Sequence, residues 1–233
     1  MVMHCHIAQH SDDGILKVSQ IAGTQPTTPD VTDFGTCAAA VPDSTPYNAK
    51  GPAAVPGTLQ AESFDLGGEG IAYHNINIAR GAPSAARVGE AAVEIDQLGN
   101  SLAVTYIRSG EWLRYSVTAQ AGAYTVALDV AAAARSAAQG GAIGMNWSLF
   151  LDVPAGDGCP APGADNELVA VADDQWNGSG GALKFAPYTV ATAFMLPQGA
   201  HTLTLCFNSD AGFSLDSLQL DACGNTVAQC KKL

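Results

Sequence analysis

Short segments in which apolar and polar residues alternate recur along the chain from Val55 onward. In residues 121–130, AGAYTVALDV, the apolar side chains at the even positions 124 to 130 fall on one face of an extended strand. Residues 200–207, AHTLTLCF, alternate in the same way. Further strand candidates are TLQAE, AAVEID, LAVTYI, EWLRYSV, NWSLFLDV, ELVAVA, PYTVATAFML and FSLDSLQL. About ten short strands separated by turn residues predict an all-β fold, a β-sandwich of the jelly-roll type.

The alternation is confined to one part of the chain. Residues 1–22 form a separate N-terminal block, and residues 23–54 are rich in Pro, Thr and Ala with no sustained apolar period. We therefore expect a linker at 23–54, a β-sandwich at 55–221 and a Cys-containing tail at 222–233.

The charge balance restricts the partners. The chain has 233 residues, of which 14% are charged, and its formal net charge is −12. An acidic surface repels phosphate backbones and anionic lipids, so nucleic acid and membrane are poor partners. The sequence also lacks the run of ~18 apolar residues that a membrane span needs. Neutral ligands and cations remain as candidate partners.

Six cysteines favour disulfides over free thiols. Cys223 and Cys230 would close a short loop, whereas Cys159 lies in a Pro/Gly-rich loop and Cys206 in a predicted strand. Disulfides indicate a secreted protein. Because no signal peptide is visible, we expect the sequence to continue upstream of Met1.

Six stretches of the sequence together resemble one known protein family. In chain order they are VPGTLQAESFDLGGEGIAYHN, AAVEID, YIRSGEWLRYSV, AGAYTVALDV, LPQGAHTLTLCF and GFSLDSLQL. Together they resemble a family 6 carbohydrate-binding module, although the segment 131–182 is longer than the family usually has. The resemblance implies a non-catalytic, monomeric sandwich that binds a polysaccharide or oligosaccharide.

The resemblance also implies an aromatic platform for a sugar ring. Sugars present apolar faces to aromatic side chains and hydroxyls to amides and carboxylates. Tyr106 matches one of two aromatic residues that hold a sugar between them at the loop end of the sandwich. Phe185 occupies the place of the family's tryptophan, and Trp176, in DDQWNGSGG, is the rival for this second position. The alternative is that these rings only pack the edge of the core.

Polar partners are implied in the same region. Ser214, in GFSLD, stands where the family has an asparagine, and serine has a shorter reach and fewer bonding groups than an amide. Asn208 lies near in sequence and would compensate, and Glu94 would supply an acceptor. Trp112 matches an aromatic that lines a second cleft in some members, but it also suits plain packing.

A structural calcium ion is a further implication of the resemblance. Family members often hold Ca²⁺ between the first and last strands, and the corresponding residues here are Gln60, Glu62 and Asp216. An amide and two carboxylates are hard oxygen donors that suit Ca²⁺. Ordinary polar residues at strand ends are the alternative interpretation.

The N-terminal segment HCHIAQHSDDGIL resembles the C-terminal copper signature of multicopper oxidases. Carried over, Cys5 and His10 would bind the mononuclear copper and His4 and His6 the trinuclear cluster, with Ile15 at the axial position. Thiolate and imidazole together form the ligand set of a blue copper. The other histidine motifs of that family are missing from this chain, so the copper cluster cannot form from it alone. We interpret the segment as the end of an oxidase domain.

Three functional hypotheses follow. The first is a carbohydrate-binding module, attached in its parent protein to a secreted copper oxidase. The second is that the chain is itself a copper-dependent oxidoreductase, and the third is a purely structural β-sandwich. No glycosidase carboxylate pair, nucleophile elbow or phosphate-binding loop is marked in the sequence, so we expect a binding protein.

Overall fold

The computed structural model describes residues 2–3, 17–18, 43–48, 51–76, 86–87, 93–133 and 142–230. The chain divides into two compact units, Met1–Val41 and Pro42–Leu233. In the first unit, β1 (Val2–Met3) and β2 (Lys17–Val18) pair antiparallel. Within the described residues, no helix is long and apolar enough to cross a membrane.

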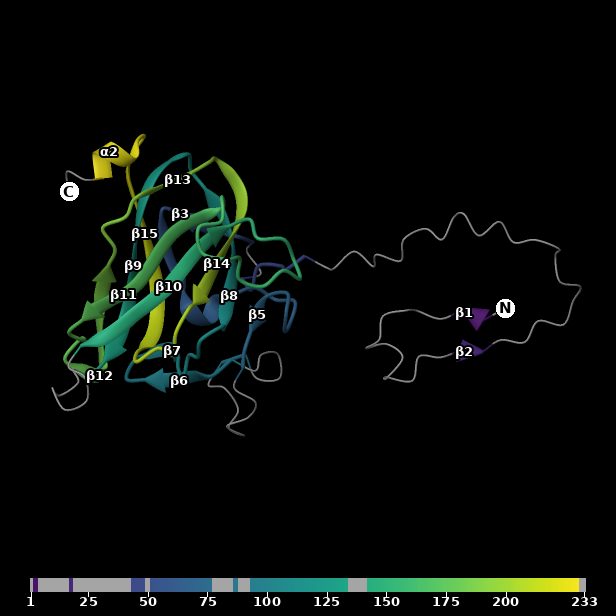
Figure 1. Ribbon diagram of the computed structural model, residues 1–233, viewed down its shortest axis with the longest axis horizontal. Helices are drawn as coiled ribbons and strands as arrows, with labels where there is room; N and C mark the ends of the chain where they lie inside the picture. Colours follow the sequence, from purple (N-terminus) through teal and green to yellow (C-terminus); the bar gives the residue numbers. More distant parts are fainter. Residues whose placement is uncertain are drawn as a thin grey trace, which may run out of the picture. The chain divides into compact units, whose positions relative to one another are not determined.

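The second unit is a sandwich of two sheets (Figure 1). Sheet I has the strand order β11 (Glu167–Trp176), β10 (Ile143–Leu151), β14 (Gly199–Phe207), β8 (Trp112–Ala119) and β3 (Ala53–Val55), and β5 (Tyr73–His74) also pairs with β8. Sheet II has the order β12 (Gly181–Thr189), β9 (Gly122–Ala132), β15 (Ser214–Gly224), β7 (Ser101–Val104) and β6 (Ile95–Leu98), with β13 (Phe194–Leu196) on β9 and β4 (Gly57–Gln60) on β15. The described residues of this unit also form two short helices, η1 (Ala61–Ser63) and α2 (Val227–Cys230). The predicted all-β jelly-roll class is confirmed.

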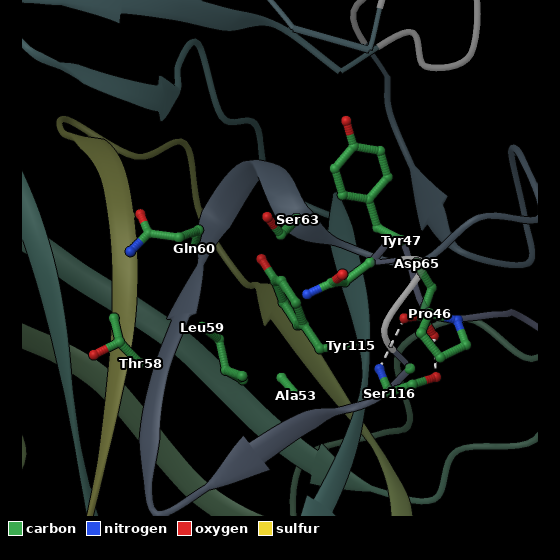
Figure 2. A pocket seen from close by; sticks show the side chains of 12 residues that line it. Pro46, Tyr47, Ala53, Thr58, Leu59, Gln60, Ser63, Asp65, Tyr115 and Ser116 are labelled. Atoms are coloured by element: carbon green, nitrogen blue, oxygen red, sulfur yellow. Dashed lines mark hydrogen bonds between the residues drawn. The ribbon is translucent and has the colours of Figure 1, made fainter.

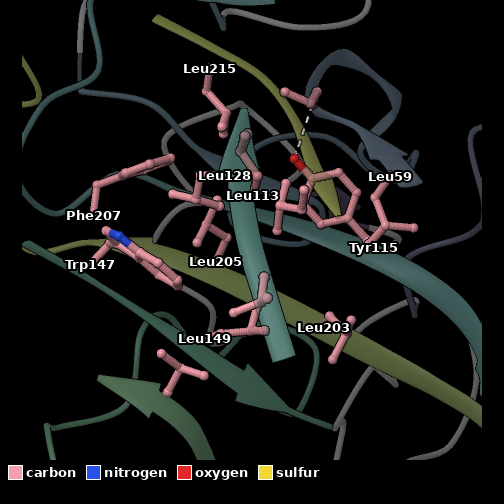
Figure 3. Packing of buried hydrophobic residues seen from close by; sticks show 14 of the residues in the cluster. Leu59, Leu113, Tyr115, Leu128, Trp147, Leu149, Leu203, Leu205, Phe207 and Leu215 are labelled. Carbon is pink, nitrogen blue, oxygen red and sulfur yellow. Dashed lines mark hydrogen bonds between the residues drawn. The ribbon is translucent and has the colours of Figure 1, made fainter. Parts of the chain in front are cut away.

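The core lies between the sheets and follows the predicted alternation (Figure 3). The four even-numbered side chains from Tyr124 to Val130 on β9 are at most 1% exposed. They meet Trp147 and Leu149 of β10 and Leu205 of β14, which are fully buried. Each such leucine contributes roughly 1.5–3 kcal/mol of burial free energy, so this layer fixes the relation between the sheets.

A second apolar cluster lies on the outer face of sheet I. It consists of Trp112, Phe150, Val153 and Cys206. The alternation predicts that Cys206 faces away from the core, and it does, yet it is fully buried. The reason is that the segment 152–166 returns over this face and is joined to it by the disulfide Cys159–Cys206.

The ends of the sandwich include residues outside the predicted limits of 55–221. Ser44 Oγ donates a 2.7 Å hydrogen bond to the carboxylate of Asp65, and Thr45 forms a β-bridge with Leu66. Strand β3 begins at Ala53. At the other end β15 continues to Gly224, and a second disulfide, Cys223–Cys230, closes the expected short loop. The prediction of disulfides is confirmed.

Candidate functional site

Several connections gather at one end of the sandwich, the lower end in Figure 1, where β6, β7 and β12 are labelled. The β7–β8 connection, residues 105–111, lies beside the β14–β15 connection, residues 208–213, because Trp112 pairs with Cys206. Leu215 pairs with Val104 on the other sheet. The register therefore brings the predicted residues of these connections to the same end of the fold.

Tyr106 lies in the β7–β8 connection with its side chain presented to solvent. It is 44% exposed and has a φ of 56°, in the left-handed region that non-glycine residues rarely adopt. Such a conformation costs of order 1 kcal/mol and persists only where the surroundings impose it. The position of this ring is therefore determined by the loop that carries it.

The loop is held first by Glu111, whose carboxylate is buried. One carboxylate oxygen accepts the backbone N–H of Ile76 at 3.0 Å, and the other accepts that of Arg108 at 2.9 Å. Bonds to an ionised acceptor are stronger than neutral ones. This residue thus joins the Tyr106 loop to the chain that follows β5.

A second anchor comes from Asp210 in the β14–β15 connection. Its carboxylate accepts the backbone N–H of Ser109 at 3.0 Å and an N–H of the Arg108 guanidinium at 2.9 Å. These bonds, the Ser109 bond foremost, lower the pKa of Asp210 below its ordinary value. Ser109 Oγ also donates to the backbone oxygen of Asn208 at 3.1 Å. Both predicted loops are thereby tied together.

Glu94 and Asn75 bring further polar groups to this end. The backbone oxygen of Glu94 accepts from Thr105 N at 2.9 Å, and its carboxylate accepts from Asn75 Nδ2 at 3.2 Å. The neighbouring Ile76 is 47% exposed. Its Cδ1 packs closely against Gly110 of the Tyr106 loop, where an added Cβ would be only 3.2 Å away. The surface around Tyr106 therefore combines apolar and hydrogen-bonding groups. Asn75 was not predicted as a site residue, although it ends the first of the six matching stretches, VPGTLQAESFDLGGEGIAYHN.

Phe185 and Ser214 lie on the same cross-strand row of sheet II. Both pair with Ala131 on β9, from opposite sides. Ser214 is thus one strand from the start of the Tyr106 loop, but Phe185 on β12 is three strands away from β7, or about 14 Å at strand spacing. This distance separates the two backbones and not the two rings, because each aromatic ring extends several ångströms from its backbone, so Phe185 stays a candidate for the second platform. The backbone places Ser214 nearer to Tyr106 than Phe185.

Trp176, the rival second platform, is half-buried at the end of β11. Its ring packs edge-on against Tyr188, with centroids 6.2 Å apart. Tyr188 is buried, and its hydroxyl donates to Asp174, so burial and this bond raise its pKa. Trp176 therefore joins the edges of the two sheets at the same end of the sandwich and presents only part of its ring.

Trp112 packs in the second apolar cluster and is 3% exposed. The Arg114 guanidinium lies 5.2 Å from its ring centroid and donates to the backbone oxygens of Pro154 and Asp157 in the covering segment. Of the two roles that the sequence allowed for Trp112, the structure shows the packing role. A ligand would reach the ring only after displacement of the segment 152–166.

A cavity of about 410 Å³ lies on the same face of sheet I, beside the covering segment. Its polar lining includes Asn146 and Ser148 of β10 and Asn208, whose amide donates to Ser148 Oγ at 3.1 Å. Cys159 and Pro162 line it from the covering segment. Asn146 and Ser148 were not predicted as site residues. The alternation of NWSLFL places them opposite the core, but nothing local in the sequence marks a cavity there.

The predicted calcium ligands lie where the first and last strands of the sandwich pair. Gln60 on β4 is opposite Ser217 on β15, next to Asp216. Burial and then the charge of Asp216 raise the pKa of Glu62, and Glu62 Oε2 is buried without a hydrogen-bond partner in the described structure. Asp129, which was not predicted, also has its pKa raised by burial and by Asp216.

These residues fit a calcium ion in their donor chemistry, because an orphaned buried oxygen and mutually repelling carboxylates favour a divalent cation. Among the described residues, however, no three His, Cys, Asp or Glu side chains are already gathered closely enough to form a metal site. The predicted copper ligands His4, Cys5, His6 and His10 lie outside the described residues.

Comparison with solved structures returns carbohydrate-binding modules. CBM6cm-2 from Cellvibrio mixtus lichenase 5A, in complex with cellotriose, has 17% identity and a TM-score of 0.42, and the match covers 72% of this chain and 97% of that one. The C-terminal CBM6 of LamC from Zobellia galactanivorans has 15% identity and a TM-score of 0.44, covering 70% and 98%. CsCBM6-3 from Clostridium stercorarium, in complex with cellobiose, has 14% identity and a TM-score of 0.45, covering 74% and 98%.

All three structures belong to the family that the sequence resembles. No protein-family model and no curated protein matches the chain. The assignment of a ligand therefore rests on the side chains of this chain.

Proposed function

We propose that the sandwich is a non-catalytic module that binds a saccharide at the loop end around Tyr106. The observation that carries the proposal is the exposed Tyr106 ring, held in a left-handed backbone conformation by a doubly anchored loop. Tyr106 belongs to neither apolar cluster and is 44% exposed, so its imposed position favours a role in binding.

The chemistry around the ring suits a neutral sugar. The Tyr106 face supplies apolar contact, and the side chains of Glu94, Asn75 and Ser214 supply acceptors and donors for hydroxyls. Because Glu111 and Asp210 fix the loop before a ligand arrives, little conformational entropy is lost on binding. Phe185 and Trp176 remain the two candidates for the second aromatic residue that contacts the sugar. Asn208 remains a candidate for hydrogen bonding to it.

The 410 Å³ cavity on sheet I is the alternative place for the same ligand class. It offers two amides and two serine hydroxyls but no exposed aromatic ring among its lining residues. Without a ring face, a sugar there would gain hydrogen bonds largely at the expense of those made to water. The Tyr106 end is therefore the favoured site.

Affinity electrophoresis in native gels tests the function directly. The protein is run with and without 1% xylan, mixed-linkage β-glucan, laminarin or agar, with bovine serum albumin as the non-binding control and calcium present throughout. The proposal predicts retardation by at least one neutral polysaccharide. Unchanged mobility in all four gels would favour the purely structural sandwich.

We further propose that Gln60, Glu62 and Asp216 hold a structural Ca²⁺, with Asp129 contributing charge. The support is the unpaired, buried Glu62 Oε2 and the electrostatic coupling of Glu62 and Asp129 to Asp216. When bound, the ion would neutralise these carboxylates and join the first strand to the last.

The relation to a secreted copper oxidase is a proposal that rests on the spacing of His4, Cys5, His6 and His10 alone. The sequence encoded upstream of Met1 tests it, whereas a copper titration followed by visible absorption tests whether this chain is itself an oxidoreductase. An intense blue band with oxygen uptake on a phenolic substrate would instead favour the oxidoreductase hypothesis for this chain. We also propose that the module is a monomer, which sedimentation velocity would check.

A further inference from the structure

A separate cavity of about 170 Å³ lies at the side of the sandwich, where residues 46–48 and 51–53 lie beside β4 and β8 (Figure 2). On β8 its floor is formed by Tyr115 and Ser116, and Ser116 lies four residues beyond Trp112, about 13 Å along the strand. The cavity is therefore distinct from the loop end that carries Tyr106. We name it the Tyr47 pocket. The other polar and aromatic residues that line it are Tyr47, Asn48, Thr58, Gln60, Ser63 and Asp65.

The described residues of the pocket offer mainly neutral hydrogen-bonding groups. Among the described lining residues, Asp65 is the one acidic side chain and none is a lysine or arginine. The Asp65 carboxylate is already bonded to Ser116 N at 2.8 Å, Ser116 Oγ at 2.7 Å and Ser44 Oγ at 2.7 Å. Two of these bonds are visible in Figure 2. An anionic ligand would find no cation among these described residues, and their amide and hydroxyl groups favour a neutral ligand.

Tyr47 supplies an ordered aromatic ring at the pocket. The Arg87 guanidinium lies 4.4 Å from the Tyr47 ring centroid and 3.8 Å from that of Phe64, and it donates to the backbone oxygen of Asp65 at 2.8 Å. One face of the Tyr47 ring is thus covered by a buried, anchored side chain, while the residue remains 38% exposed. A stacked ring of this kind loses little entropy when a ligand contacts its other face.

The volume limits the size of the ligand. At about 170 Å³ the cavity is smaller than the ~300–1,000 Å³ pockets that enclose drug-sized molecules. A single sugar residue fits a cavity of this size. Its hydroxyls can form hydrogen bonds with the neutral amide and hydroxyl groups of Asn48, Thr58 and Ser63.

We propose that the Tyr47 pocket is a second carbohydrate subsite, which accepts a single neutral sugar residue. The ligand class rests on the proposed function of the protein, but the residues are independent of the Tyr106 site. The pocket requires residues 46–48, which belong to the segment expected to be a linker, so that segment takes part in recognition.

The experiment uses the full chain and measures ¹H–¹⁵N shift titrations with methyl β-D-xyloside, methyl β-D-glucoside, xylotriose and cellotriose. All titrations are made in a Tyr106→Ala background, which removes the first site. Tyr47→Ala is compared there with Tyr47→Phe, which keeps the ring, and unchanged melting temperatures establish that both variants are folded.

We expect saturable shifts of the Asn48, Ser63 and Ser116 amides with at least one probe. The dissociation constant should rise about fivefold or more in Tyr47→Ala and less than about twofold in Tyr47→Phe, because the contact is made by the ring. Equal affinities of Tyr47→Ala and Tyr47→Phe would overturn the subsite, and so would the absence of shifts in the Tyr106→Ala background.

The outcomes separate the two proposals. If the unmodified protein binds saccharide and Tyr106→Ala abolishes this binding, the result supports the Tyr106 site and overturns the Tyr47 pocket. Binding that survives Tyr106→Ala undiminished but is lost in Tyr47→Ala supports the Tyr47 pocket and contradicts the Tyr106 site.

Discussion

Of the two disulfides among the described residues, Cys159–Cys206 closes the longer loop, and the stability lost on its removal follows from the length of that loop. The two cysteines are 47 residues apart, whereas Cys223 and Cys230 are seven apart. In the chain-entropy relation these loops stabilise the fold by about 4.1 and 2.4 kcal/mol at 25 °C. The longer disulfide should therefore contribute about 1.7 kcal/mol more.

The perturbation is Cys159→Ala, with Cys223→Ala as the matched control. In each variant a half-buried cysteine is removed, and a buried one, Cys206 or Cys230, remains as a protected thiol. Guanidinium chloride unfolding without reductant, followed by far-UV circular dichroism, gives the free energy of unfolding. Acrylamide quenching of tryptophan fluorescence adds a local readout, since Cys159→Ala should loosen the segment that covers Trp112.

The reasoning would be refuted by a free energy of unfolding for Cys159→Ala equal to or higher than that of Cys223→Ala. Unchanged quenching in Cys159→Ala would show that the disulfide does not hold the segment over Trp112. The cluster of Trp112, Phe150 and Val153 would then suffice to keep the segment in place.

Three further perturbations give separate tests. Calcium at 1 mM should raise the melting temperature of the unmodified protein but have little effect on Glu62→Gln, measured by scanning calorimetry; equal shifts in both would argue against the calcium proposal. Ser109 and Arg108 hold the pKa of Asp210 below its ordinary value of 3.8. The hydrogen bonds from the loop to the Asp210 carboxylate are therefore intact above pH 3.8 and are lost as the pH falls through the lower pKa of the folded state. Saccharide affinity should accordingly decrease in acid, whereas Asp210→Asn should bind more weakly at neutral pH and lack this acid-dependent step, as judged by titration calorimetry. Leu128→Ala removes a fully buried side chain and should cost about 2–5 kcal/mol in urea unfolding; a loss below 1 kcal/mol would contradict its place in the core.

The sandwich was largely predictable because most of its strands have one apolar face. The period of two in AGAYTVALDV and AHTLTLCF identified β9 and β14 and their buried sides. The first half of β12, GALKF, was missed because these edge residues are mostly exposed and show no alternation. Strand β5 has only two residues, too few for any period to be visible.

The loop end was predictable only in part, because cross-strand distance is not encoded in local pattern. The sequence identified Tyr106, Asn208 and Ser214, whose segments the register brings to one end. It did not show that Phe185 lies three strands from β7. Nor did it show that a distant disulfide would bury Trp112.

The segment before the sandwich resembled a linker for a related reason. Its contacts with the sandwich use hydroxyl and backbone groups, such as Ser44 with Asp65 and Thr45 with Leu66, rather than an apolar stripe. Hydrophobic periodicity cannot detect contacts of this kind. The Tyr47 pocket consequently has no signature in the sequence.

Titration calorimetry of Tyr106→Ala tests the central claim most directly. The titrant is the polysaccharide that retards the protein most in affinity gels, and the control is Met195→Ala, an equally exposed apolar residue on β13 at the opposite end of the sandwich. Loss of one ring contact of about 1.5 kcal/mol predicts an affinity about tenfold lower in Tyr106→Ala, with Met195→Ala unchanged. Equal affinity in Tyr106→Ala and the unmodified protein would contradict the assignment of the loop end as the binding site.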